Sequence, residues 1–144
     1  MILSRTLQIG NFVKYYASTV KIAEIHTNEC IIQFEDGTLL SVGYDLLIGL
    51  QTESNVLLST NVITKVSSKK LPLHVKEVYM IDIMGRKYFI HMLEFDEQII
   101  CRFDNFLSFK YFHELQNICT LVNDTFSLSL FPGEDQHLSH SPNL

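Results

Sequence analysis

The feature that most constrains the fold is a turn signal, Asp36-Gly37, between two short apolar runs. Residues 31–34 precede this signal and residues 39–42 follow it. Asp-Gly in this setting is typical of a β-hairpin, because a type I′ turn needs positive φ at both central residues. The sequence therefore predicts two antiparallel strands at 31–34 and 39–42, joined by a type I′ turn.

Further short strands are expected on both sides of this hairpin. Residues 12–16 form one candidate, and residues 20–25 form a second in which apolar and polar side chains alternate. Residues 44–47 are expected to form a single helical turn before a last strand. Several strands this close together favour a small SH3-like β-barrel, whose closure leaves no exposed sheet edge.

The second half of the chain is expected to mix strands with helix. A short helix starts near Thr52, and residues 75–103 have the pattern of a three-stranded meander. Residues 110–123 carry an apolar stripe at helical spacing, with Ser108 as the expected N-cap. Residues 126–130 alternate as a final strand. The predicted fold class is α+β: an SH3-like barrel at 1–51, the meander and C-terminal helix within 52–131, and a disordered tail at 132–144.

Cysteine usage and hydropathy indicate the cellular setting. The three cysteines are widely spaced and each lies among apolar neighbours, which is typical of buried free thiols in a reducing compartment. The first residues lack the apolar core of a signal peptide. No apolar run approaches the roughly eighteen residues of a membrane helix. We therefore expect a cytoplasmic protein with no membrane partner.

The sequence contains none of the common catalytic motifs, since G-x-S-x-G, H-E-x-x-H, C-x-x-C, the P-loop and G-x-G-x-x-G are all absent. A Cys–His pair would need a partly exposed thiolate, whereas Cys101 and Cys119 lie on predicted core faces. His113 falls on the polar side of its predicted helix. His137 and His140 lack a third metal ligand. We expect no enzymatic activity, no metal, no cofactor and no small-molecule substrate.

Aromatic and basic side chains interleave in the N-terminal unit. Such a pattern stacks bases and holds phosphates, while the same residues also suit a protein-binding groove or the packing of a barrel. Residues 65–76 form a second basic segment with no acidic residue. The net charge of −5 favours a protein partner over a nucleic acid. The candidate partner-binding residues are Phe12, Lys14, Tyr15, Tyr16, Lys21, Tyr44, Lys65, Lys69, Lys70 and Lys76.

Two stretches far apart in the chain carry a family resemblance. Leu7-Gln8-Ile9-Gly10-Asn11-Phe12-Val13 opens the predicted barrel, and His113-Glu114-Leu115-Gln116-Asn117 lies in the predicted C-terminal helix. In this order and spacing they resemble a family of small, mostly uncharacterised phage and prophage proteins with an L-x-I-G-N-x-V strand and an H-x-L-Q-N helix. The resemblance covers residues 7–130 and departs from the family pattern at 55–75. The family supplies no catalytic residues.

The resemblance implies a non-enzymatic protein that blocks or redirects host machinery. The best expectation is an inhibitor of a host defence complex, similar to an anti-CRISPR protein. It would contact a nuclease or its ribonucleoprotein in the host bacterial cytoplasm. Two alternatives stay open. One is a small RNA- or DNA-binding module that uses the basic segments 14–21 and 65–76. The other is a phage structural or accessory protein.

Overall fold

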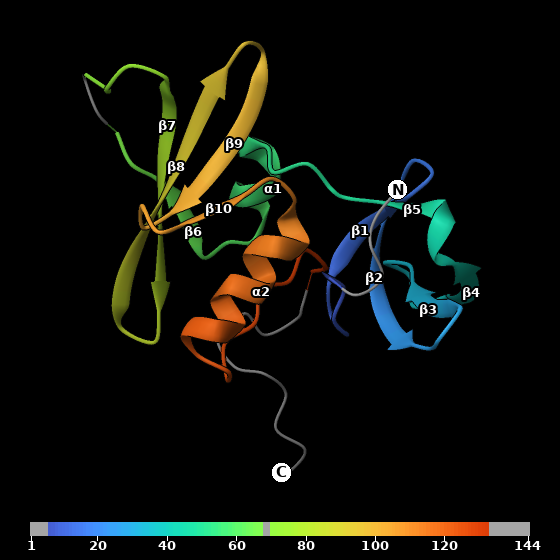
Figure 1. Ribbon diagram of the computed structural model, residues 1–144. Helices are drawn as coiled ribbons and strands as arrows, with labels where there is room; N and C mark the ends of the chain where they lie inside the picture. Colours follow the sequence, from blue (N-terminus) through green and yellow to red (C-terminus); the bar gives the residue numbers. More distant parts are fainter. Residues whose placement is uncertain (1–5, 68–69, 133–144) are drawn as a thin grey trace.

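The computed structural model describes residues 6–67 and 70–132, and these form two five-stranded antiparallel sheets with helix α2 between them (Figure 1). The first sheet has the spatial order β4-β3-β2-β1-β5. The one-turn 3-10 helix η2 (Tyr44–Leu46) joins β4 to β5. The strands of the first sheet are β1 (Phe12–Tyr15), β2 (Ser18–Ile25), β3 (Glu29–Gln33), β4 (Leu39–Gly43) and β5 (Leu47–Ile48).

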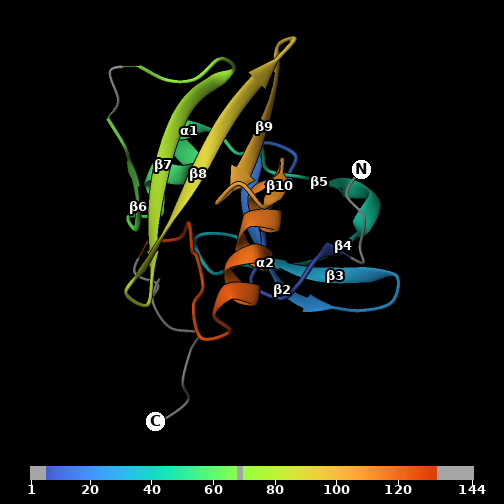
Figure 2. The ribbon, with the colours of Figure 1, turned by 60° about the vertical axis from the view of Figure 1, so that its left-hand side comes forward.

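The second sheet has the order β10-β9-β8-β7-β6, and both α-helices lie on one of its faces (Figures 1 and 2). The expected meander corresponds to its three longest strands, β7, β8 and β9. The strands of the second sheet are β6 (Ile63–Lys65), β7 (Val75–Ile83), β8 (Arg86–Phe95), β9 (Gln98–Phe103) and β10 (Leu107–Phe109). The helices are α1 (Ser54–Ser59) and α2 (Phe112–Val122).

The predicted fold class, α+β with a closed SH3-like barrel, is wrong. The chain is mostly β, because two five-stranded sheets account for most of its regular structure and the two α-helices are only 6 and 11 residues long. The first sheet is open, since β4 and β5 are its two edges and no pairing joins them within 6–67 and 70–132. β5 has only two residues, too few to complete a barrel wall.

The turn at Asp36-Gly37 forms the expected hairpin but not the expected turn type. Gly37 has φ of +92°, whereas Asp36 is not among the residues with positive φ, as a type I′ turn would require. Gly37 N–H donates to Phe34 O, and Phe34 N–H donates to Thr38 O. The connection is therefore a three-residue loop with glycine at its left-handed position.

Strand β1 contributes to two apolar cores at once. Val13 packs with the first sheet's own core, while its neighbour Phe12 points the other way into the larger core of the second sheet. Both side chains are fully buried. Phe12 meets Phe131 edge-on at 4.8 Å between ring centroids. The expected division near residue 51 stays a prediction, because residues from both sides of it share this larger core.

Helix α2 uses its polar side to hold the N-terminal segment. The side-chain amide of Gln116 accepts from Phe12 N–H at 2.8 Å and donates to Gly10 O at 2.9 Å and to Leu128 O at 3.0 Å. Asn11 Nδ2 donates to Asn117 Oδ1 at 3.0 Å. These bonds, here called the N-terminal clasp, join the two stretches that carry the family resemblance. Both stretches therefore have a structural role.

Two local expectations need correction, and a third is not tested. Helix α2 begins after Tyr111, and Ser108 lies in β10 instead of capping the helix. The Glu114 carboxylate closes the helix start by accepting from the backbone N–H of Tyr111 at 2.9 Å. Residues 126–130 form no strand, although Phe126 and Leu128 are buried as their alternation predicts. The expected disordered tail, from 133 onward, lies outside the described residues.

No helix among the described residues is long and apolar enough to cross a membrane.

Candidate binding surface

The structure separates the four aromatic residues that the sequence grouped. Phe12 lies in the core and presents no surface. Tyr15 and Tyr16 are in edge-on contact at 4.7 Å, and Tyr16 is 70% exposed. Tyr44 lies at the end of β4, where its hydroxyl donates to His26 O at 2.5 Å. Tyr16 is thus the only one of the four classed as exposed.

The lysines of the predicted patch do not form one basic surface. Lys14 and Lys21 lie on β1 and β2 of the first sheet, whereas Lys65 and Lys76 lie on β6 and β7 of the second. Lys65 Nζ forms an ion pair with Glu77 at 2.8 Å, which neutralises its charge. Lys70 is exposed in the β6–β7 connection, and Lys69 lies outside the described residues. This arrangement is unlike the continuous basic groove that binds single-stranded nucleic acid.

A cleft of about 660 Å³ lies beside the first sheet, where α1 and the segment after α2 approach it. Its apolar lining includes Phe34, Val56 and Phe131. Glu35 and Asp36 from the β3–β4 turn add two carboxylates to it. A cleft of this size is within the range of ligand and peptide pockets. The position of this cleft depends on how the two sheets pack, which the sequence does not reveal.

The net charge of the protein is concentrated in one part of the first sheet. Residues 24–45, here called the acidic segment, hold five of the sixteen acidic residues and no Lys or Arg. The remaining eleven acidic residues are matched by the eleven Lys and Arg of the chain, so the rest of the molecule has no formal net charge. The five are Glu24, Glu29, Glu35, Asp36 and Asp45. The acidic segment was not among the predicted binding residues, although its charges are evident from the sequence alone.

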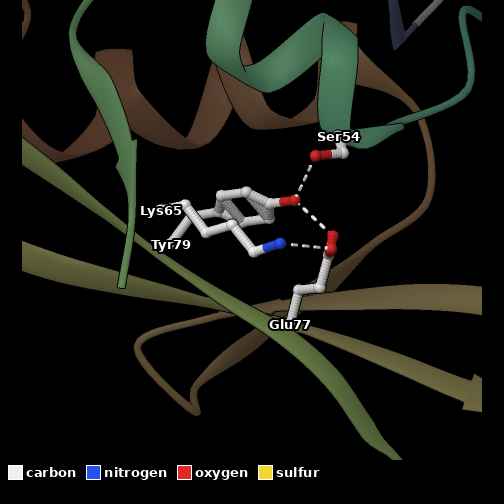
Figure 3. A network of polar contacts seen from close by, with 4 residues as sticks. All are labelled: Ser54, Lys65, Glu77 and Tyr79. Carbon is white, nitrogen blue, oxygen red and sulfur yellow. Dashed lines mark hydrogen bonds and ion pairs between the residues drawn. The ribbon is translucent and has the colours of Figure 1, made fainter. Parts of the chain in front are cut away.

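A polar network ties α1 to the second sheet beside a smaller cleft (Figure 3). The Tyr79 hydroxyl donates to the Glu77 carboxylate and lies 2.6 Å from the Ser54 hydroxyl, while Lys65 holds the other Glu77 oxygen. Burial, and then the Glu77 hydrogen bond, raise the pKa of Tyr79 to about 12. A phenol held neutral in this way is a poor general base at neutral pH. The network therefore fits a structural tie better than a catalytic group.

The groups that would carry nucleophilic chemistry are buried. Burial raises the pKa of both the Cys101 and Cys119 thiols to about 12, so neither is a thiolate at neutral pH. All three cysteines are free and buried, as predicted. His113 was expected on an exposed polar side but is only 2% exposed, because that side of α2 packs on the N-terminal segment. Burial lowers its pKa, and its Nε2 lies 3.3 Å from Thr6 Oγ1.

No protein-family model, no curated protein and no solved structure matches this chain. The function of this protein is therefore inferred from the chain's own residues.

Proposed function

We propose that this chain is a non-enzymatic binding protein that attaches to a protein partner through the acidic side of its first sheet. The proposed contact surface consists of the acidic segment, the cleft beside it and the exposed ring of Tyr16. The cleft extends this surface to Val56 of α1 and to Phe131, and the second sheet and α2 form the scaffold that holds it. The single observation that carries the proposal is that the whole formal net charge falls in the acidic segment.

Charge concentrated in one segment of the first sheet has a direct physical consequence for association. Such a field steers a partner of opposite charge and repels partners of like charge, so it contributes to the association rate and to specificity. Apolar side chains beside the charges supply contact area, and aromatic residues are enriched in protein interfaces. Tyr16 and the Phe34 side chain in the cleft are suited to that role.

The same proposal includes a more specific role, the inhibition of a host defence complex, which depends on the family resemblance. A phage- or prophage-borne protein that inhibits a host defence complex in the cytoplasm would need a binding surface and no active site. The buried thiols and the neutral Tyr79 support that expectation. The nucleic-acid alternative is less well supported, because its lysines divide between two sheets and Lys65 is paired with Glu77.

Site-specific photo-crosslinking tests the proposed surface. A photoreactive phenylalanine analogue replaces Tyr16 in the full-length tagged chain, and the same analogue replaces Phe106 as a matched control. Phe106 is 84% exposed and lies in the turn between β9 and β10. After irradiation in lysate of the cells that make the protein, we expect one protein partner linked at position 16 and none at position 106.

Two variants and a nuclease treatment test the crosslink further. Glu35→Lys should weaken the crosslink at position 16 at least fivefold, while Glu97→Lys on the β8–β9 turn should leave it unchanged. Nuclease treatment should have no effect. A crosslink confined to position 106 would overturn the proposal. A crosslinked product that nuclease removes would also overturn it and would favour the nucleic-acid alternative.

A further inference from the structure

Strand β4 presents a row of free backbone groups along one edge of the first sheet. In an antiparallel pair, residues that exchange hydrogen bonds alternate with residues that do not. Phe34 N–H bonds Thr38 O, and Leu40 and Val42 continue this register opposite Ile32 and Cys30. The N–H groups of Leu39, Ser41 and Gly43 and the C=O groups of Leu39 and Ser41 therefore point away from β3, whereas Gly43 is the N-cap of η2. No backbone partner is found for them within the described part of the chain.

This edge lacks the usual protection against strand pairing. Natural proteins protect a sheet edge with a charged residue, a proline, a bulge or a very short strand. β4 has five residues, Leu39 to Gly43, without charge or proline, and its pairing with β3 has no register shift. Leu39 and Leu40 are 58% and 40% exposed. By contrast, the opposite edge strand β5 has only two residues.

The β4 edge lies at the outer side of the molecule. In Figure 1, β4 is at the far side of the first sheet from the second sheet. Neither helix covers it, and η2 leaves it at Tyr44. Within residues 6–67 and 70–132, an approaching chain therefore meets the edge itself, η2 at its end and the acidic segment around it.

We propose that β4 accepts an extended segment of a protein partner as a sixth strand of the first sheet, with Lys or Arg on both sides of its apolar residues. This inference rests on the proposed function and specifies how the partner binds. Strand addition supplies affinity through main-chain hydrogen bonds and specificity through side chains. Strand addition would use the outward-facing backbone N–H groups of Leu39, Ser41 and Gly43.

The charges around β4 decide the chemistry of this segment. Glu35 and Asp36 precede the strand, Asp45 follows it, and Glu29 lies opposite Gly43. The strand has five residues and spans about 17 Å at ~3.3 Å per residue. A bound segment therefore meets carboxylates at both of its ends, and lysine or arginine there would complete ion pairs at the rim.

The same charges argue against a second copy of the chain as the occupant. Antiparallel pairing of two β4 strands places the Glu35 end of one copy beside the Asp45 end of the other. Parallel pairing places the Glu35 ends together. Like charges face each other in both cases, and like charges opposed across a strand pair are destabilising. A basic segment from another protein avoids this repulsion.

The test uses defined peptides and the full-length protein. The probe is a nine-residue peptide in which valine and threonine alternate between two lysines at each end. The control peptide has glutamate in place of every lysine. Amide exchange by NMR reports on Leu39, Ser41 and Gly43. We expect the basic peptide to slow exchange at these three amides at least tenfold, and the acidic peptide to have no effect.

Three variants and a modified peptide separate strand addition from general attraction. Ser41→Pro removes an outward N–H without touching a bond to β3 and should abolish binding, while Ser41→Thr should retain it. N-methylation of alternate peptide residues should prevent binding in one register and preserve it in the other. Replacing both Glu35 and Asp45 by their amides should weaken binding at least fivefold at low salt.

The outcomes are distinguishable from failure of the proposed function. Absence of peptide binding, or binding without protection of the three amides, overturns strand addition. A concentration-dependent dimer with protected β4 amides also overturns it and identifies a second copy as the occupant. If the crosslink at position 16 persists in either case, the proposed function stands and only the binding mode is wrong. If the basic peptide binds and protects the β4 amides but no protein is crosslinked at position 16, the result counts against the proposed function.

Discussion

The side-chain oxygen of Gln116 on α2 accepts a hydrogen bond from the backbone N–H of Phe12 on β1 at 2.8 Å. The bond is buried and joins residues 104 positions apart. Gln116 also donates to two carbonyl groups, so one amide holds three segments of the chain together. Gln116 therefore helps to hold the first sheet against the second, together with the packing of Phe12 on Phe131 and the Asn11–Asn117 bond.

We predict that Gln116→Leu destabilises the fold. Leucine preserves the volume but leaves the buried Phe12 N–H without an acceptor, at a cost of about 1–3 kcal/mol. Urea denaturation measures the loss of unfolding free energy. Gln98→Leu at the exposed start of β9 is the control and should change stability by less than about 0.5 kcal/mol. Equal stability of both variants would show that the clasp contributes little.

His113 is predicted to make the protein acid-sensitive. Burial lowers its pKa below the ordinary value of 6.5, so the unfolded chain binds a proton before the folded chain does. Stability is therefore complete above pH 6.5 and declines as the pH falls below that value. Urea denaturation at pH 7 and pH 5 should show a smaller difference for His113→Gln than for the parent. An unchanged pH dependence would place the sensitivity elsewhere, and His26→Gln on the exposed β2–β3 turn is the matched control.

Tyr79 is predicted to give a loss of stability at alkaline pH. Its pKa is raised from 10.0 to about 12, so above pH 10 the unfolded chain releases a proton that the folded chain retains. The stability contributed by the neutral phenol is complete below pH 10 and declines as the pH rises toward 12. Tyr79→Phe should remove this decline between pH 9 and pH 11. Tyr88→Phe, on the same sheet, should retain it.

Two glycines are predicted to differ in their tolerance of alanine. A Cβ at Gly49 would lie 2.5 Å from Cγ of the Tyr111 ring, which leaves no room for a methyl group. A Cβ at Gly43 would meet only Asp45 Oδ1 at 2.7 Å, the end of an exposed side chain that can rotate away. Gly49→Ala should cost about 1–3 kcal/mol, as overpacking does, and Gly43→Ala much less. Comparison of their thermal midpoints tests the difference, and a larger loss for Gly43→Ala would contradict it.

The local pattern of the sequence was sufficient to predict most secondary structure. Alternation of apolar and polar residues predicted β2, the Asp-Gly signal between two apolar runs predicted β3 and β4, the strand pattern of residues 75–103 predicted the meander of β7, β8 and β9, and the helical stripe predicted α2. These patterns involve residues that are close together in the sequence, so they can be recognised without knowledge of the fold. The segment at 126–130 shows the limit of this reasoning. Its alternation correctly indicated buried Phe126 and Leu128, but a strand also needs a partner edge, and none is available there.

The candidate site was predicted poorly because exposure is a tertiary property. Phe12 and Tyr16 both read as aromatic surface residues, yet one lies in the core and the other is exposed. The acidic segment was visible in the sequence as a run without Lys or Arg. Its relation to a free strand edge was not visible, because pairing of β4 with β3 alone emerges only in the sheet.

By itself, the sequence determined the strands, the hairpin at Gly37, the burial of the three cysteines and the placement of the net charge within residues 24–45. Each of these follows from short-range pattern or from side-chain chemistry. The tertiary structure decided that the first sheet stays open, that His113 is buried, and that Gln116 bonds to Phe12. The burial of His113 and the Gln116–Phe12 bond need contacts between residues about a hundred positions apart, and whether such contacts form depends on how the whole chain packs.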